Sequence, residues 1–142
     1  MKSLEQDAAR TELIARVDSV TADTKPRWGN FTSRAMLDHL ARSAEMAAGE
    51  RDVAPKKLPI RFFPLKQLII YLLPFPKGAP TAPELLNDSP EPIEKSKETL
   101  RRIITAFDPK PGNHPAFGRM SAHAWSVLVY RHMDHHLRQF GA

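Results

Sequence analysis

Two histidines near the end of the chain have a spacing that could bind a metal ion. His132 and His136 are four residues apart in a segment that favours an α-helix. On a helix this spacing puts both side chains on one face, with about 5–6 Å between Cβ atoms. They also continue an apolar stripe that begins with Trp125 and Leu128. We therefore expect both imidazoles to point inward, where they are costly unless they are hydrogen-bonded or bind metal.

A third ligand has to come from another helix, and His39 is the candidate. It is the only histidine in the second predicted helix and adjoins the apolar positions Met36 and Leu40. Three histidines leave at least one coordination position open, which is typical of catalytic rather than structural sites. Imidazole binds zinc, nickel, iron and copper. We expect one divalent ion, zinc or nickel.

The same residues have a plainer interpretation, a solvent-exposed helix end that is rich in histidine. The spacing of His132 and His136 does not by itself separate this from a metal site. For the remaining histidines we expect structural or surface roles. His135 should point away from the pair, His123 should lie at the surface, and His114 should brace a loop.

Three polar residues near the end of the chain could assist the site. Gln139 follows His136 by three residues and could accept a hydrogen bond from that imidazole. The alternative is an ordinary exposed glutamine at a helix end. Arg131 and Arg138 could orient an anionic substrate, although arginines near a helix C-terminus also complement the helix dipole. No inward carboxylate accompanies the histidines, so the sequence identifies no catalytic residue.

Four amphipathic helices are predicted to position these side chains. Apolar residues recur at helical spacing over residues 3–20, 33–48, 90–107 and 121–140. Ser3 with Gln6, Thr32 or Ser33, and Ser89 are candidate caps. No alternating strand pattern is found, so we predict an all-α four-helix bundle in a single domain, residues 1–142. The third and fourth helices are expected to bury four residues between them: Leu100, Ile103, Trp125 and Leu128.

The connection between the second and third helices is long and rich in proline, which prevents one continuous helix over residues 50–88. It predicts a crossover with a short helix at about residues 65–73. Residues 53–80 carry many large apolar side chains, five basic residues and no acidic residue. Such a patch needs a partner: the bundle itself, a second subunit or a membrane surface. We expect it to pack on the bundle and form a homodimer contact or a lid, with Lys56 and Lys57 favouring anionic substrates.

Composition excludes several kinds of chemistry. Without cysteine the chain has no disulfide, no thiolate ligand and no cysteine nucleophile. Its 142 residues, 42% of them hydrophobic, suit one domain with a core. The net charge of +5 comes without a dense basic stripe, so we expect no nucleic-acid partner. No apolar stretch is long enough to span a bilayer, and we expect a cytoplasmic protein without stable membrane insertion.

Several motifs along the chain occur together in one known family. The second helix carries Met36-Leu37-Asp38-His39-Leu40, and the last carries His132-x-x-x-His136-x-x-Gln139. Other stretches are Arg27-Trp28-Gly29, Pro76-Lys77-Gly78, Pro80-Thr81, His114-Pro115-x-Phe117-Gly118 and His135-His136-Leu137-Arg138-Gln139-Phe140-Gly141. Over nearly its whole length the chain resembles the DinB-like (YfiT-like) superfamily of metal-binding four-helix bundles, in an uncharacterised branch.

The resemblance implies one metal ion held by His39, His132 and His136. It further implies a hydrolase, or a transferase or isomerase that uses a low-molecular-weight thiol. Many relatives carry Arg-Gly-Gln after the last histidine, where this chain has Leu137-Arg138-Gln139.

The leading hypothesis is therefore a metal-dependent enzyme acting on a small molecule. The ion would lower the pKa of bound water toward ~7 or favour a bound thiolate. A non-catalytic metal- or ligand-binding bundle is the alternative. The lack of an inward carboxylate favours thiol transfer or simple binding over a self-contained hydrolase.

Overall fold

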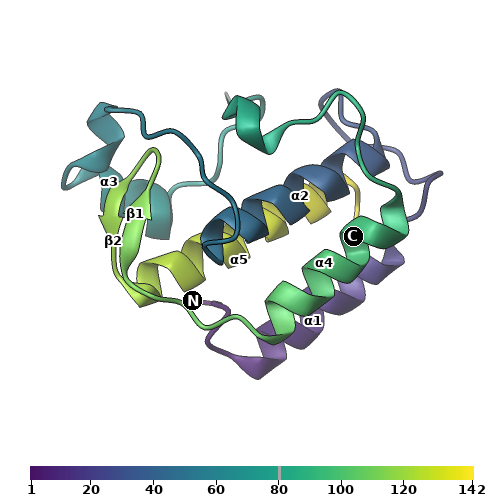
Figure 1. Cartoon of the computed structure of the whole chain (residues 1–142), viewed down its shortest axis with the longest axis horizontal. Coiled ribbons are helices and arrows are strands. Elements are labelled where there is room, and N and C mark those ends of the chain that lie inside the picture. The colour runs from purple at the N-terminus through teal and green to yellow at the C-terminus, as the bar shows by residue number, and fades with distance from the viewer. Residues whose placement is uncertain (80) are drawn as a thin grey trace.

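Four long helices are the main elements of the computed structural model, which describes residues 1–79 and 81–142. They are α1 (Asp7–Ser19), α2 (Ser33–Ala47), α4 (Ile93–Thr105) and α5 (Ala122–Gln139). Figure 1 shows α1 beside α4 and α2 beside α5. The predicted mostly helical architecture is confirmed. No helix in the described ranges is both long enough and apolar enough to cross a membrane.

Each long helix packs extensively against two others. Both α4 and α5 pack on α1 and on α2, so α4 and α5 occupy opposite corners of the core. The residues expected between the third and fourth helices are indeed buried, with Leu100 completely enclosed and Trp125 6% exposed. The prediction that these two helices bury them by packing directly on each other is wrong, because α1 and α2 lie between them.

Helix starts follow the local chemistry of capping residues and prolines. The Thr32 hydroxyl accepts the Ala35 N–H at 3.1 Å, as predicted. The predicted capping box of Ser3 and Gln6 is wrong, because α1 starts at Asp7 and the Gln6 side chain makes no capping bond. The prediction of Ser89 as a cap is also wrong, since α4 begins only at Ile93. A residue that precedes proline avoids helical backbone angles, and Pro92 therefore delays the start of this helix.

A short hairpin departs from the all-α prediction. Strand β1 (Gly112–His114) pairs antiparallel with β2 (Gly118–Met120), with His114 opposite Gly118. Three-residue strands are too short to show an alternating pattern, which is why no strand was predicted. Gly118 has a φ of +67°, a backbone conformation that glycine adopts without strain.

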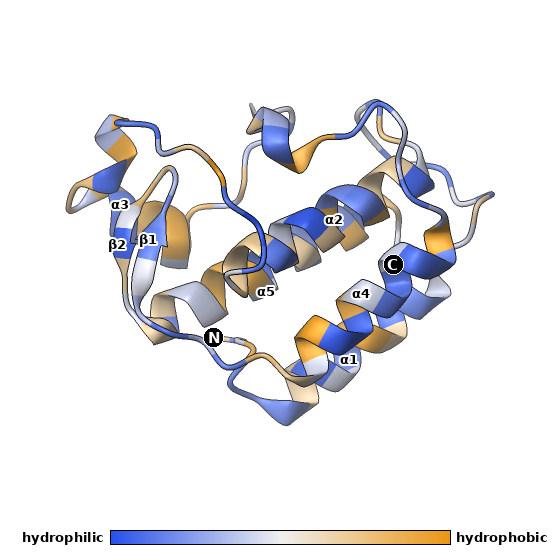
Figure 2. Ribbon diagram, viewed as in Figure 1, coloured by the Kyte–Doolittle hydropathy of each residue, from blue (hydrophilic) through white to orange (hydrophobic). Residues whose placement is uncertain are grey.

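The connection between α2 and α4 contains the predicted short helix, made of α3 (Leu65–Gln67) and a π-helical turn (Leu68–Leu72). Two 3₁₀ turns, Pro59–Arg61 and Pro83–Leu85, flank it. Its hydrophobic residues are visible around α3 in Figure 2. Ile70 is buried, whereas Phe62, Phe63 and Leu72 are 65%, 80% and 70% exposed. Pro80, part of the predicted crossover and of one motif, lies outside the described residues.

Candidate metal centre

Three histidines converge where α2 and α5 pack together. One nitrogen each from His39, His132 and His136 lies within 4.8 Å of the other two. The Nε2 atoms of His39 and His132 are 3.2 Å apart. Two nitrogens bound to one tetrahedral ion at about 2.0–2.1 Å would be separated by roughly 3.3 Å. The spacing of this pair therefore fits two ligands of one ion.

Hydrogen bonds behind two of the rings fix which nitrogen faces the centre. His39 donates Nδ1–H to the Leu85 carbonyl at 2.9 Å, because a carbonyl only accepts. The Gln139 amide donates Nε2–H to the Trp28 carbonyl at 2.9 Å, which turns its Oε1 toward the His136 Nδ1 at 2.8 Å. Both imidazoles therefore carry their proton on Nδ1 and present an Nε2 lone pair to the common point.

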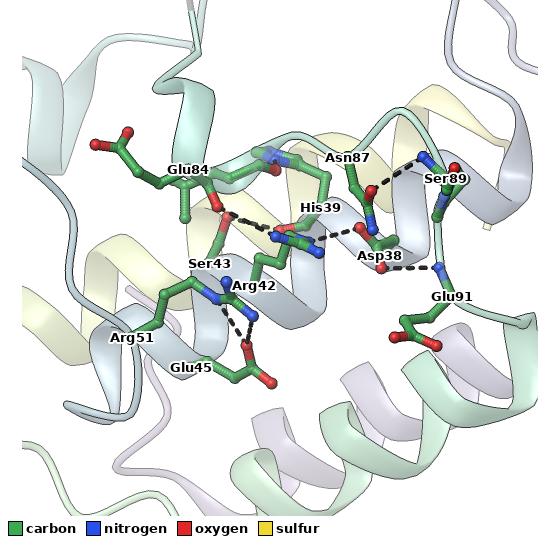
Figure 3. Close-up of polar contacts among 12 residues, drawn as sticks. Asp38, His39, Arg42, Ser43, Glu45, Arg51, Glu84, Asn87, Ser89 and Glu91 are labelled. Atoms are coloured by element: carbon green, nitrogen blue, oxygen red, sulfur yellow. Dashed lines mark hydrogen bonds and ion pairs between the residues drawn. The ribbon is translucent and has the colours of Figure 1, made fainter.

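A polar network anchors the part of α2 that carries His39 (Figure 3). The Ser43 hydroxyl donates to the His39 carbonyl at 2.8 Å. Asp38 accepts from Arg42 Nε at 2.8 Å and from the Glu91 N–H at 3.1 Å. Arg42 also donates to the Glu84 carbonyl at 3.5 Å, which connects α2 with the segment that supplies the Leu85 carbonyl. Asp38 therefore bonds within this network and is not among the residues that converge on the candidate metal centre.

Close packing at Gly29 holds the Gln139 amide in place. Gly29 has a φ of +79°, and a Cβ there would lie 2.7 Å from the Gln139 Nε2. The neighbouring Arg27 donates its backbone N–H to the Gln139 carbonyl at 2.7 Å. Any side chain at residue 29 would therefore displace the amide that orients His136.

Burial keeps the three imidazoles neutral. Desolvation is the largest cause of the lowered pKa of His39, His132 and His136. For His136 the pKa is lowered to about 4. Repulsion from neighbouring imidazoles lowers the pKa of His132 and His136 further. Metal ligation requires neutral imidazole, so the site is in the required protonation state at neutral pH.

A cavity of about 700 Å³ opens onto the three histidines. That volume suits a small-molecule ligand. Its walls are mostly apolar and include both tryptophans of the chain, Trp28 and Trp125. Among the described lining residues, Lys56 is the one with a permanently charged side chain, and none is Asp or Glu.

The arginines expected to orient a substrate lie elsewhere. Arg131 donates to backbone carbonyls of the connection, including that of Ile69 at 2.8 Å, and so holds the π-helical turn on α5. Arg138 is exposed and pairs with Asp134 at 3.0 Å. Neither side chain lines the cavity, and their predicted role toward an anion rests on the sequence alone.

The other histidines, His114, His123 and His135, lie in different environments. His123 is exposed and pairs with Glu5 at 2.7 Å, as expected of a surface residue. His135 lines the cavity, and its ring centroid lies 5.1 Å from that of His136, contrary to the expectation that it points away. It follows Leu128 by seven residues, about two helical turns, and this spacing could have placed it on the inner face.

His114 both braces the hairpin turn and lines the cavity. Its Nδ1 accepts the backbone N–H groups of Ala116 and Phe117 at 3.0 and 3.2 Å, so it braces the hairpin turn as predicted. Its ring also lines the cavity, 5.2 Å from the Trp125 ring. Burial lowers the pKa of His114 to about 4. The sequence showed no sign of this second role.

Comparison with known proteins identifies the family. Residues 2–142 match the family described as "Protein of unknown function (DUF1569)". No curated protein and no solved structure gives a significant match. The chain therefore belongs to the DUF1569 family.

Proposed function

We propose that this DUF1569 protein is a metal-dependent enzyme in which His39, His132 and His136 hold one divalent ion, zinc or nickel. One observation carries the proposal: two of the imidazoles are preset by Nδ1–H donation to Leu85 and Gln139, and the third lies at ligand spacing. Such supporting partners are typical of metal-binding histidines. A solvated histidine-rich helix end would need no such arrangement.

We propose further that the four long helices form a DinB-like four-helix bundle, with residues 50–88 as its crossover. Two features support this: each long helix packs on two others, and the histidines come from α2 and α5 at their contact.

The reaction we propose is transfer involving a low-molecular-weight thiol, with hydrolysis second. An ion held by three imidazoles keeps an open position, where it would act as a Lewis acid or favour a thiolate. The chain contributes an apolar enclosure that excludes water and holds a small substrate. No carboxylate is found among the described lining residues to serve as a general base, which favours the thiol reaction. The cytoplasm, where thiols stay reduced, is the compartment we propose.

A non-catalytic metal- or ligand-binding protein is the second candidate, favoured by the same lack of a lining carboxylate. A screen decides between the candidates. Zinc- and nickel-loaded protein is tested on small esters and amides, and on electrophiles with a low-molecular-weight thiol. We expect turnover that needs both metal and thiol and that disappears in His132→Ala but not in His123→Ala. Turnover of esters without thiol would indicate a hydrolase, and no metal-dependent turnover in either panel would leave the binding protein.

We also propose that residues 58–73, called the α3 segment from here on, form a homodimer contact or a lid. Its exposed apolar side chains Phe62, Phe63 and Leu72 support the contact. Leu58 and Ile60, from the same segment, line the cavity and support the lid.

A further inference from the structure

His114 lines the cavity and carries an N–H that no described residue accepts. Its Nδ1 accepts two backbone N–H groups, those of Ala116 and Phe117. A ring nitrogen that accepts hydrogen bonds carries no proton, so in the neutral ring the proton is on Nε2. This Nε2 makes no hydrogen bond to any residue in the ranges 1–79 and 81–142, and the ring forms part of the cavity wall. A donor with a fixed tautomer is thus available to a ligand.

Two basic residues, Lys56 and Lys66, lie near the hairpin turn that carries this donor. The Lys56 backbone N–H donates to the Pro115 carbonyl at 2.7 Å, which brings Lys56 next to the hairpin turn. Lys56 lines the cavity. Lys66 is also near enough for its charge to act on the His114 ring. Lys56 is also close enough to help lower the pKa of Glu84, whose carboxylate accepts the Ala54 N–H and is not among the described lining residues. The described lining at this end thus includes a lysine and no carboxylate, which favours an anion.

Apolar residues line the cavity between this end and the three histidines. The ring of Trp125 lies beside His114, and His132 follows seven residues later on α5. Seven residues of helix span about 10 Å. Leu128 and Val129 lie between Trp125 and His132 on α5 and line the cavity, and the Phe75 ring lies 6.3 Å from that of His132.

We infer that the site takes an elongated apolar compound with a carboxylate at one end. The carboxylate accepts from the His114 Nε2–H and pairs with the Lys56 ammonium, and the apolar body extends along the cavity toward the histidines. The reacting end at His39, His132 and His136 rests on the proposed function. Recognition of the carboxylate does not need the metal. His114 is a binding residue that selects the substrate class.

Tryptophan fluorescence reports occupancy directly, because both tryptophans line the cavity. The probes are octanoate and octylamine, which share a chain length and differ in the charge and hydrogen bonding of the head group. They are titrated into zinc-loaded and metal-free protein, and zinc content is measured on the same samples. We expect octanoate to change the fluorescence saturably in both forms, and to bind at least about tenfold more tightly than octylamine. Equal affinity for the two probes in the wild type would overturn the inference.

Two substitutions at His114 separate its two nitrogens. In His114→Asn the side-chain oxygen can still accept the turn N–H groups, but the donor at Nε2 is lost. In His114→Gln an amide N–H replaces the Nε2 donor and the brace is lost. We expect octanoate affinity to fall about tenfold in His114→Asn and less in His114→Gln. Unchanged affinity in a folded His114→Asn protein would contradict the role of the donor.

The lysine gives an independent test that does not depend on the hairpin. Lys56 is exposed, and Lys57 is an exposed neighbour outside the cavity lining. We expect Lys56→Gln to weaken octanoate binding several-fold and Lys57→Gln to leave it unchanged. If the protein binds zinc but substitution of His114 and of Lys56 leaves octanoate affinity unchanged, this inference is wrong and the proposed metal function stands. Octanoate binding that depends on both residues, in a protein that takes up no zinc, would remove the proposed metal function and keep the inference.

Discussion

Each imidazole of the candidate centre has a different hydrogen-bonding environment. His39 and His136 have their Nδ1 protons committed to Leu85 and Gln139. The His39 Nε2 is therefore an acceptor, and the His132 Nε2, 3.2 Å away, is the donor to it. An ion at the common point would replace this one hydrogen bond, and the His132 proton would then reside on Nδ1. Only one of the three rings has to change tautomer for metal to bind.

Gln139 is predicted to strengthen metal binding through His136. In Gln139→Ala, His136 loses the acceptor that fixes its tautomer, and zinc affinity should fall roughly 10–100-fold. Competition with a chromogenic chelator measures this. Arg138→Ala is the matched control, because it removes an exposed neighbour that does not touch the rings. Equal zinc affinity in all three proteins would show that Gln139 is only a structural residue.

Much of the centre was predictable at the level of single residues. Histidine spacing and the apolar stripe led to the three residues that converge. The cavity roles of His114 and His135 were not predicted, because each depends on the position of elements remote in sequence. The hairpin turn brings His114 against Trp125 of α5. Nothing in the sequence around either residue predicts that the two rings meet.

At the scale of elements, the helices themselves were predictable and their partners were not. Hydrophobic periodicity reports which face of a helix is buried. It does not report which helix covers that face, which is why α4 and α5 were wrongly paired. The start of α4 was misplaced because Ser89, which precedes Pro90, resembles a cap. Pro92 keeps the residue before it out of the helical conformation, so the helix begins only at Ile93.

Core packing of α4 and α5 gives a prediction at this scale. Leu100→Ala should lower the free energy of unfolding by about 2–5 kcal/mol, because the side chain is completely buried. Trp125→Ala should cost a similar amount. Glu98→Ala, at an exposed position of the same helix, should change it by less than about 0.5 kcal/mol. Urea denaturation measures all three, and losses well under 1 kcal/mol at Leu100 and Trp125 would mean that these side chains do not pack as described.

For the whole molecule, the buried imidazoles make stability depend on pH. Burial lowers the pKa of five histidines from the ordinary value of about 6.5: His39, His114, His132, His135 and His136. Below pH 6.5 the unfolded chain binds protons that the native protein does not yet bind. The stability present above pH 6.5 is therefore lost as pH falls toward 4, the pKa of His114 and His136.

We predict that metal-free protein melts at a lower temperature at pH 5 than at pH 7. His114→Asn removes one of the depressed histidines while it keeps the brace of the turn, so its melting temperature should vary less over this range. Differential scanning calorimetry measures both proteins. Identical pH dependence would contradict the buried, neutral state of His114.

The exposed apolar side chains of the α3 segment lead to a prediction about assembly. Leu68 and Leu72 are 37% and 70% exposed on its π-helical turn. If they form a homodimer contact, size-exclusion chromatography with light scattering should give a dimer mass for the wild type. The Leu68→Glu/Leu72→Glu variant should give a monomer mass. A monomeric wild type at micromolar concentration rules the contact out.

Metal content per chain tests the central claim most directly. Protein purified after loading with zinc or nickel is measured by elemental analysis alongside five single variants. We predict about one ion per chain in the wild type, in His114→Ala and in His123→Ala, and clearly less in His39→Ala, His132→Ala and His136→Ala. If all five variants retain metal as the wild type does, or if the wild type retains none, the three histidines are not a metal centre.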